Sequence, residues 1–343
     1  MNKQEKYMAR CIELAKKGQG YVAPNPMVGS VIVYEDRIIG EGYHQEYGTA
    51  HAEVNAINSV KDKNLLSKST LYVSLEPCAH FGKTPPCSDL IIANKIPNVV
   101  IGSIDPFSAV NGKGIQKLKD NGIDVTTGVL EKECQVLNKR FFTFHEKKRP
   151  YIILKWAQTK DGFIDKTRTD GEIGINWITQ PETKSLVHLW RSQEMGVLVG
   201  RQTVAIDNPQ LNVREIYGKD PVRILLDSQL KLDYQHMANK FSARTIVLNT
   251  VETKTVGQID FIQLKSLDVT EILHSLWENE IQSVIIEGGT FTLEQFLSKD
   301  AWDEIRVLEG INIFNDGLKA PTIHRIPQKI TNFGKDTIFQ FWK

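Results

Sequence analysis

The chain has 343 residues, with 42 basic and 41 acidic side chains that leave a formal net charge of +1. Hydrophobic residues make up 41% of it and charged residues 24%, as in soluble globular proteins, and the length suggests two domains. The balanced charge disfavours a nucleic-acid binder, and no apolar run approaches the roughly 18 residues of a membrane helix. Because the amino-terminal residues also lack the apolar core of a signal peptide, we expect a cytoplasmic protein without membrane or nucleic-acid partners.

The first half alternates predicted strands and helices. The spacing of apolar residues predicts helices over residues 4–17, from about 51, and over 88–95, 113–121 and 131–145. It predicts strands over 28–34, 37–43, 71–75, 99–104 and 123–127. This alternation favours an α/β sandwich with a mixed sheet.

Three metal-ligand side chains fall at the ends of these elements: His51 in the first turn of a helix, and Cys78 and Cys87 after the strand 71–75. A neutral imidazole and two thiolates are good zinc ligands, and a catalytic zinc leaves its fourth position open for water. Glu53, two residues after His51, is placed to move the protons of that water. The zinc deaminases of nucleobases share this H-x-E and P-C arrangement. The pattern therefore predicts hydrolytic removal of an exocyclic amine from a ring carbon.

The segment between the two cysteines is longer than in that signature, with eight residues between Cys78 and Cys87. It supplies His80 and Lys83, which are donors suited to an anionic group on a small substrate. A nucleic-acid substrate would need a basic channel, which the sequence does not show. Two alternatives stay open: a structural zinc with His80 as its fourth ligand, and a nucleic-acid-editing protein.

The charged segment 146–150, which ends in a proline, marks the predicted domain boundary. Beyond it the pattern predicts strands over 151–156, 195–199, 222–226, 245–248, 260–264 and 283–287, and helices over 181–193, 268–279 and 290–298. Gly288 and Gly289 separate the last of these strands from the last helix, which suggests a nucleotide phosphate site or an ordinary turn. No G-x-G-x-x-G fingerprint supports a Rossmann domain.

Four motifs of the first half, at residues 25–29, 42–44, 51–53 and 76–87, together resemble the bifunctional deaminase/reductase family of riboflavin biosynthesis. The resemblance implies a cytidine-deaminase-like α/β/α sandwich over residues 1–146, a zinc-dependent pyrimidine deaminase. It implies zinc at His51, Cys78 and Cys87, proton transfer by Glu53, and substrate contacts at Asn25, His44, His80 and Lys83. Segment 105–110 departs from the family, which usually has a second proline–asparagine loop there.

Further matches run through the second half, at residues 155–157, 161–162, 177–179, 191, 200–203, 207–209, 211, 214, 227–228 and 287–289. They imply a dihydrofolate-reductase-like α/β domain over residues 147–343 that uses NADPH to reduce a ribosyl side chain to ribityl. The implied NADPH contacts are Ala157, Trp177, Thr203, Asp207, Ser228, Gly289, Thr290, Phe291, Thr292, Leu293, Glu294 and Gln295. The implied substrate contacts are Lys155, Arg191, Leu211, Arg214 and Glu287, with the arginines on the phosphate.

The leading hypothesis is therefore an enzyme of two steps that uses one zinc per chain and NADPH. Its expected partners are small phosphorylated pyrimidines and, from the family, further copies of the chain. Departures from the family at residues 159–160 and 172–176 motivate an alternative. In it, an active zinc deaminase is joined to a domain that binds nucleotide but is reductase-deficient or regulatory.

Overall fold

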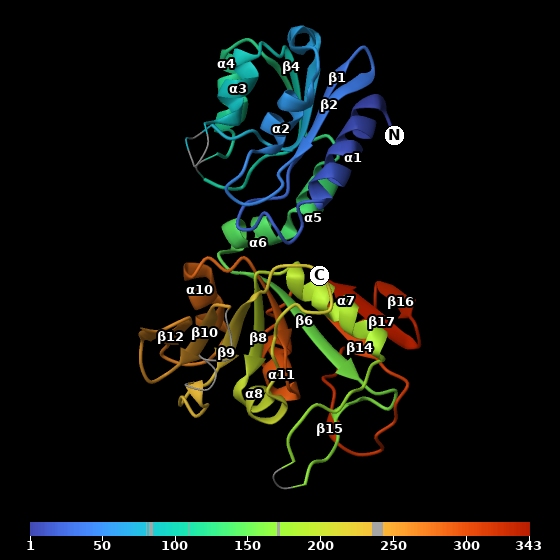
Figure 1. Cartoon of the computed structure of the whole chain (residues 1–343), viewed down its shortest axis with the longest axis vertical. Coiled ribbons are helices and arrows are strands. Elements are labelled where there is room, and N and C mark those ends of the chain that lie inside the picture. The colour runs from blue at the N-terminus through green and yellow to red at the C-terminus, as the bar shows by residue number, and fades with distance from the viewer. Residues whose placement is uncertain (80, 82–84, 109, 170–171, 235–242) are drawn as a thin grey trace. The chain divides into compact units, whose positions relative to one another are not determined.

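The computed structural model describes residues 1–79, 81, 85–108, 110–169, 172–234 and 243–343. The chain divides into two compact units, Met1–Lys147 and Lys148–Lys343. Each unit is an α/β structure with its own large sheet (Figure 1). Within the described ranges, no helix is both long and apolar enough to cross a membrane.

Unit 1 is built on a five-stranded sheet in the order β2-β1-β3-β4-β5. Its elements are α1 (Lys3–Lys16), β1 (Gly29–Tyr34), β2 (Arg37–Tyr43), α2 (Ala52–Ser59), η1 (Lys63–Lys68), β3 (Thr70–Leu75), α3 (Cys87–Ala93), β4 (Asn98–Ser103), α4 (Lys113–Asp120), β5 (Asp124–Thr127), α5 (Glu131–Leu137) and α6 (Lys139–Lys147). β1 pairs antiparallel with β2 and β3, whereas β3, β4 and β5 are parallel. The carboxyl ends of β3 and β4 therefore meet at one edge of the sheet.

Helices cover both faces of this sheet because successive strand residues point to opposite sides. Ile32 and Val73 pack with α2, α3 and α4 on one face. Val31 and Tyr72 pack with α1 and α5 on the other. Figure 1 shows the two helical layers on either side of the strands. The predicted α/β sandwich with a mixed sheet is confirmed.

The predicted helix over residues 131–145 is interrupted at Asn138, where α5 ends and α6 follows. The buried Asn138 side chain accepts a hydrogen bond from the Met27 N–H (2.8 Å) and donates one to the Met27 carbonyl (2.9 Å). The helical periodicity does not reveal this break, because its cause lies 111 positions earlier in the chain. His51 likewise lies just before α2, as its N-cap, rather than inside the first turn.

Unit 2 is built on a ten-stranded sheet in the order β11-β12-β10-β9-β8-β13-β6-β14-β17-β16, with a small sheet of β15 and β7. Its elements are β6 (Tyr151–Gln158), β7 (Phe163–Asp165), α7 (Pro181–Ser192), β8 (Gly196–Gly200), α8 (Arg201–Asp207), β9 (Val222–Leu226), β10 (Thr245–Asn249), β11 (Lys254–Val256), β12 (Ile259–Gln263), α10 (Val269–Glu278), β13 (Ser283–Glu287), α11 (Thr290–Ser298), β14 (Glu304–Glu309), β15 (Leu318–Lys319), β16 (Lys329–Phe333) and β17 (Asp336–Trp342). From β12 to β14 the strands are parallel, and antiparallel strands close both edges.

The core of unit 2 again has two layers of helices. Ile152 and Leu154 of β6 pack with α10 and α11 on one face of the sheet. Ile153, between them, packs with α7 on the other face, where α8 also packs. The apolar pattern predicted neither α8 nor the strands beyond residue 300. α8 has only seven residues, too few for a helical period to stand out.

Candidate functional site

His51, Cys78 and Cys87 converge at one edge of the unit 1 sheet. His51 caps α2, Cys78 follows β3, and Cys87 begins α3. His51 Nδ1 lies 3.3 Å from Cys87 Sγ and 3.6 Å from Cys78 Sγ, and the three ligand atoms all lie within 4.8 Å of one another. Tetrahedral ligands at about 2.0–2.3 Å from zinc are themselves about 3.5 Å apart. The three side chains therefore fit a zinc ion with three protein ligands.

The two thiols are electrostatically unequal. The Cys87 N–H donates a hydrogen bond to Cys78 Sγ (3.3 Å). Hydrogen bonding from the Cys87 thiol, followed by that from His51, lowers the pKa of Cys78 to about 4. Cys78 in turn raises the pKa of both Cys87 and His51. The arrangement favours a thiolate at Cys78, and the thiolate is the form of cysteine that binds a metal.

Glu53 lies in the first turn of α2 and is 3% exposed. Burial raises its pKa to about 7. A carboxyl group with a pKa near the working pH can both accept and return a proton. Glu53 is not part of the metal-ligand group, so its carboxyl group is available for proton transfer.

Asn25 and His44 lie next to the metal ligands. His44 Nδ1 donates a hydrogen bond to the Ala50 carbonyl (3.1 Å), so its Nε2 accepts one from Asn25 Nδ2 (3.1 Å). Burial lowers the pKa of His44 and keeps the ring neutral. The rings of His44 and His51 meet edge to face, with centroids 5.4 Å apart. The other two predicted substrate contacts, His80 and Lys83, lie outside the described residues.

Glu76, between β3 and Cys78, is a carboxylate that the sequence reasoning did not single out. It is 4% exposed. It accepts hydrogen bonds from the backbone N–H groups of Asp105, Gly112, Gly114 and Ile115. Its place directly before the P-C pair was the one available signal.

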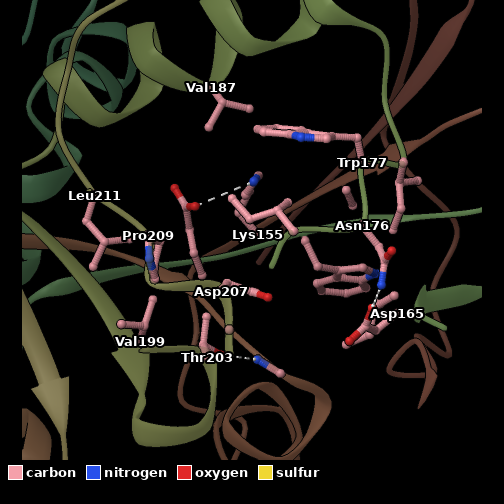
Figure 2. Close-up of a pocket in the computed structure, with 18 of the residues that line it drawn as sticks. Lys155, Asp165, Asn176, Trp177, Val187, Val199, Thr203, Asp207, Pro209 and Leu211 are labelled. Carbon is pink, nitrogen blue, oxygen red and sulfur yellow. Dashed lines mark hydrogen bonds and ion pairs between the residues drawn. The ribbon is translucent and has the colours of Figure 1, made fainter. Parts of the chain in front are cut away.

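Unit 2 contains a pocket of about 320 Å³ (Figure 2). Its walls include residues of β6, α7, α8 and β13 and of the segment between β7 and α7. Ten predicted reductase-site residues line it: Lys155, Ala157, Trp177, Arg191, Thr203, Asp207, Leu211, Arg214, Glu287 and Gly289. Ser228 and residues 290–295 are not among its described lining residues.

Charged side chains of three elements meet on one wall of this pocket. Glu287 of β13 stands beside Lys155 of β6 in the parallel register, with Lys155 Nζ 3.6 Å from Glu287 Oε2. Arg191 of α7 binds the same carboxylate with two N–H groups, at 2.9 and 2.8 Å. Figure 2 shows Lys155 pointing toward this carboxylate.

The pKa values follow from this crowding. Burial lowers the pKa of Lys155. Burial alone would raise the pKa of Glu287, but Arg191 and Lys155 outweigh it and lower that pKa to about 2. The pocket therefore holds a carboxylate that stays ionised and two cations in contact with it.

A second polar cluster on the pocket wall joins the predicted Asp207 to three residues that the sequence did not single out, Asp165, Arg168 and Asn176. The Arg168 guanidinium binds Asp165 at 2.6 and 3.1 Å and reaches Asp207 at 3.3 Å. Asn176 Nδ2 donates to Asp165 Oδ1 at 2.7 Å, a bond drawn in Figure 2. Its signal was the departure from the family pattern at residues 172–176, which includes Asn176.

Gly288 and Gly289 lie between β13 and α11 and leave the amino-terminal end of α11 accessible. The Gly289 N–H donates to Thr203 Oγ1 (3.3 Å), also drawn in Figure 2. A Cβ added at Gly289 would meet nothing within 4 Å, so the backbone there faces open space. A helix amino terminus that a ligand can approach in this way favours an anionic group.

Two domain families match the chain: the cytidine and deoxycytidylate deaminase zinc-binding region over residues 1–103, and the RibD C-terminal domain over residues 150–310. The riboflavin biosynthesis protein RibD of Aquifex aeolicus is 40% identical over 351 residues, which cover 98% of this chain and 97% of the relative. The protein of that name from Escherichia coli is 35% identical over 322 residues, covering 88% and 86%.

Solved structures resemble the whole chain as well. The diaminohydroxyphosphoribosylaminopyrimidine deaminase/5-amino-6-(5-phosphoribosylamino)uracil reductase of Thermotoga maritima is 39% identical, with a TM-score of 0.84 and 98% of each chain covered. RibD of Acinetobacter baumannii is 29% identical, with a TM-score of 0.88 and coverage of 99% and 98%. Since these likenesses span both units and both sites, the chain belongs to the RibD family and is a bifunctional deaminase and reductase of riboflavin biosynthesis.

Proposed function

We propose that unit 1 removes the exocyclic amine of 2,5-diamino-6-(5-phosphoribosylamino)pyrimidin-4(3H)-one. We propose that unit 2 then reduces the ribosyl group of the resulting 5-amino-6-(5-phosphoribosylamino)uracil to ribityl. The Thermotoga maritima relative carries the names of both activities. The observation that carries the first step is the convergence of His51, Cys78 and Cys87 next to the buried Glu53.

In unit 1, His51, Cys78 and Cys87 would hold zinc, which when bound lowers the pKa of water toward neutrality. Glu53 accepts a proton from the attacking water and passes it to the departing amine. The water oxygen bonds to the ring carbon, the carbon–nitrogen bond breaks, and ammonia leaves. Asn25 and His44 orient the pyrimidine through their amide and imidazole groups.

In unit 2, the open end of α11 at Gly288 and Gly289 supports binding of the NADPH diphosphate. NADPH when bound supplies the hydride. Trp177, Thr203 and Asp207, in the same pocket, would contact the nicotinamide half. Ala157 would contact it too, whereas Ser228 and residues 290–295 would contact parts of the cofactor beyond this pocket.

At the charged wall, Lys155 would donate a hydrogen bond to the ribosyl group. Arg191 is already held by two bonds to Glu287, so its part is to keep that carboxylate in place. The Arg214 side chain is 41% exposed and lines the pocket. Arg214 is therefore the stronger choice for the substrate phosphate, and Leu211 would pack against the substrate.

The alternative, a unit 2 that binds nucleotide but is reductase-deficient or regulatory, rests on the departures at residues 159–160 and 172–176. Incubation of the protein with the diaminopyrimidinone ribosyl phosphate, with and without NADPH, followed by mass analysis, separates the possibilities. We expect the deaminated product without NADPH and the ribityl product with it. Deaminated product that persists with NADPH present supports the alternative. Unchanged substrate contradicts the role of unit 1.

A further inference from the structure

Glu76, which directly follows β3, caps α4 with its carboxylate. The N-cap residue of α4 is Gly112, which has no side chain to bond the first N–H groups of the helix. Glu76 Oε1 accepts from Gly114 (2.9 Å) and Ile115 (3.2 Å), in the first turn. Glu76 Oε2 accepts from Gly112 (2.9 Å) and from Asp105 (3.4 Å) after β4. A buried carboxylate deprived of such donors would remain desolvated without compensating hydrogen bonds, which is unfavourable.

The first turn of α4 also lies directly against the residue before Cys78. A Cβ added at Gly114 would lie 2.0 Å from the Pro77 carbonyl oxygen, a distance that no side chain tolerates. Only glycine therefore lets the helix approach Pro77 so closely. The cap and this contact act together, because the hydrogen bonds of Glu76 hold the first turn of α4 against the turn that contains Pro77.

That turn carries a metal ligand. The Cys78 carbonyl accepts a hydrogen bond from the Ser88 N–H (3.1 Å), and Cys78 Sγ accepts one from the Cys87 N–H (3.3 Å). Cys78 is thus held on one side by α3 and on the other by α4 through Glu76 and Pro77. The hydrogen bonds of this second attachment all go to one carboxylate, that of Glu76.

We propose that Glu76 is a positioning residue of the metal centre, which sets the place of Cys78 Sγ relative to His51 and Cys87 by locking its turn onto α4. The inference rests on the proposed zinc site. Loss of a partner in the outer shell of a metal site typically costs ten- to a hundredfold in metal affinity. The same carboxylate also anchors Asp105, at the start of the segment that departs from the family pattern.

The test uses full-length Glu76→Gln, which keeps the shape of the side chain but sets an NH2 group against two of the N–H donors. We expect zinc to pass to a chromogenic chelator about tenfold faster than from the wild-type protein. In the cobalt-substituted protein we expect shifted ligand-field absorption bands. A merely structural role would lower the thermal unfolding midpoint and leave both of these metal readouts unchanged.

The matched control is Glu131→Gln, which changes an exposed glutamate in the first turn of α5 and should release zinc like the wild type. If Glu76→Gln does not fold, Glu76→Asp keeps the negative charge but shortens the side chain by one methylene group, weakens its hydrogen bonds to the first turn of α4 and should give the same loss. A wild-type protein that holds no zinc would contradict the proposed metal centre. A zinc-loaded Glu76→Gln with wild-type release and cobalt spectrum overturns the role of Glu76 alone.

Discussion

Glu76 in unit 1 and Glu287 in unit 2 both stand at the carboxyl end of a parallel strand, β3 and β13. Each is little exposed, 4% for the whole of Glu76 and 12% for the Glu287 side chain. Their partners differ in kind. Glu76 accepts from backbone N–H groups, whereas Glu287 pairs with the side chains of Lys155 and Arg191.

The difference teaches how each site is held. Backbone donors carry no net charge and stay with their helix, so Glu76 attaches the turn of Cys78 to α4. Side-chain cations can change partners when an anionic ligand arrives. Glu287 therefore orders Lys155 and Arg191 on the pocket wall, and in the proposed function Lys155, the more loosely held of the two, is the one that meets the substrate.

The largest expected effect comes from removing proton transfer in unit 1 alone. In Glu53→Gln we expect ammonia release to fall by about 10²–10⁴-fold, because a general acid–base group is lost. NADPH oxidation with the deaminated pyrimidine supplied should be unchanged and serves as the control in the same chain. Intact ammonia release would contradict the assignment of Glu53.

The next largest effect should come from disrupting the charged cluster of Lys155, Arg191 and Glu287 on the pocket wall of unit 2. Glu287→Gln leaves Lys155 and Arg191 without their carboxylate, and loss of one partner from a buried pair costs about 3–5 kcal/mol. All six tryptophans lie in unit 2, so tryptophan fluorescence during urea unfolding follows this unit alone. Glu182→Gln, at an exposed glutamate in the first turn of α7, is the matched control. Equal stability of both variants would show that Glu287 is not the anchor of the wall.

Low pH should lower the stability of unit 2 over a pH range that is set by the pKa of Glu287. Its pKa falls from the ordinary 4.5 to about 2 because Arg191 and Lys155 outweigh its burial. A carboxyl group with a depressed folded-state pKa stabilises the fold above its ordinary pKa and loses that contribution as pH falls through the folded value. We expect a loss of about 3 kcal/mol between pH 4.5 and 2. Urea unfolding at a series of pH values measures the free energy of unfolding. Its dependence on pH between 4.5 and 2 should be weaker in Glu287→Gln.

The smallest effect should come from the second polar cluster. Arg168→Ala removes the bridge between Asp165 and Asp207, and we expect the KM for NADPH to rise about three- to tenfold with little change in kcat. Arg168→Lys should restore only part of it, because an ammonium cannot bind two carboxylates as the guanidinium fork does. Arg325→Ala, at a surface arginine that contacts Trp302, is the control. An unaltered KM in Arg168→Ala would show that Asp207 does not need this bridge.

The amino-acid sequence was enough to predict a zinc-binding deaminase domain in unit 1, which the match to that domain family confirms. His51 and Glu53 are two residues apart, and Cys78 follows directly after a strand, so local spacing already places them at element ends. The alternation of strands and helices was enough for the α/β sandwich as well. The resemblance to a known family extended the prediction to a pocket where ten of the expected residues meet.

Only the tertiary structure decided which distant residues hold these groups. Glu76 reaches the first turn of α4 nearly forty positions away, and Asn138 ends a helix because of Met27. Lys155 meets Glu287 through the parallel pairing of β6 with β13. A periodic pattern reports which face of its own element is buried, whereas pairing register and helix docking depend on the whole sheet. The metal-site motif is local in the sequence, whereas the residues that hold these groups in place come from distant parts of the chain.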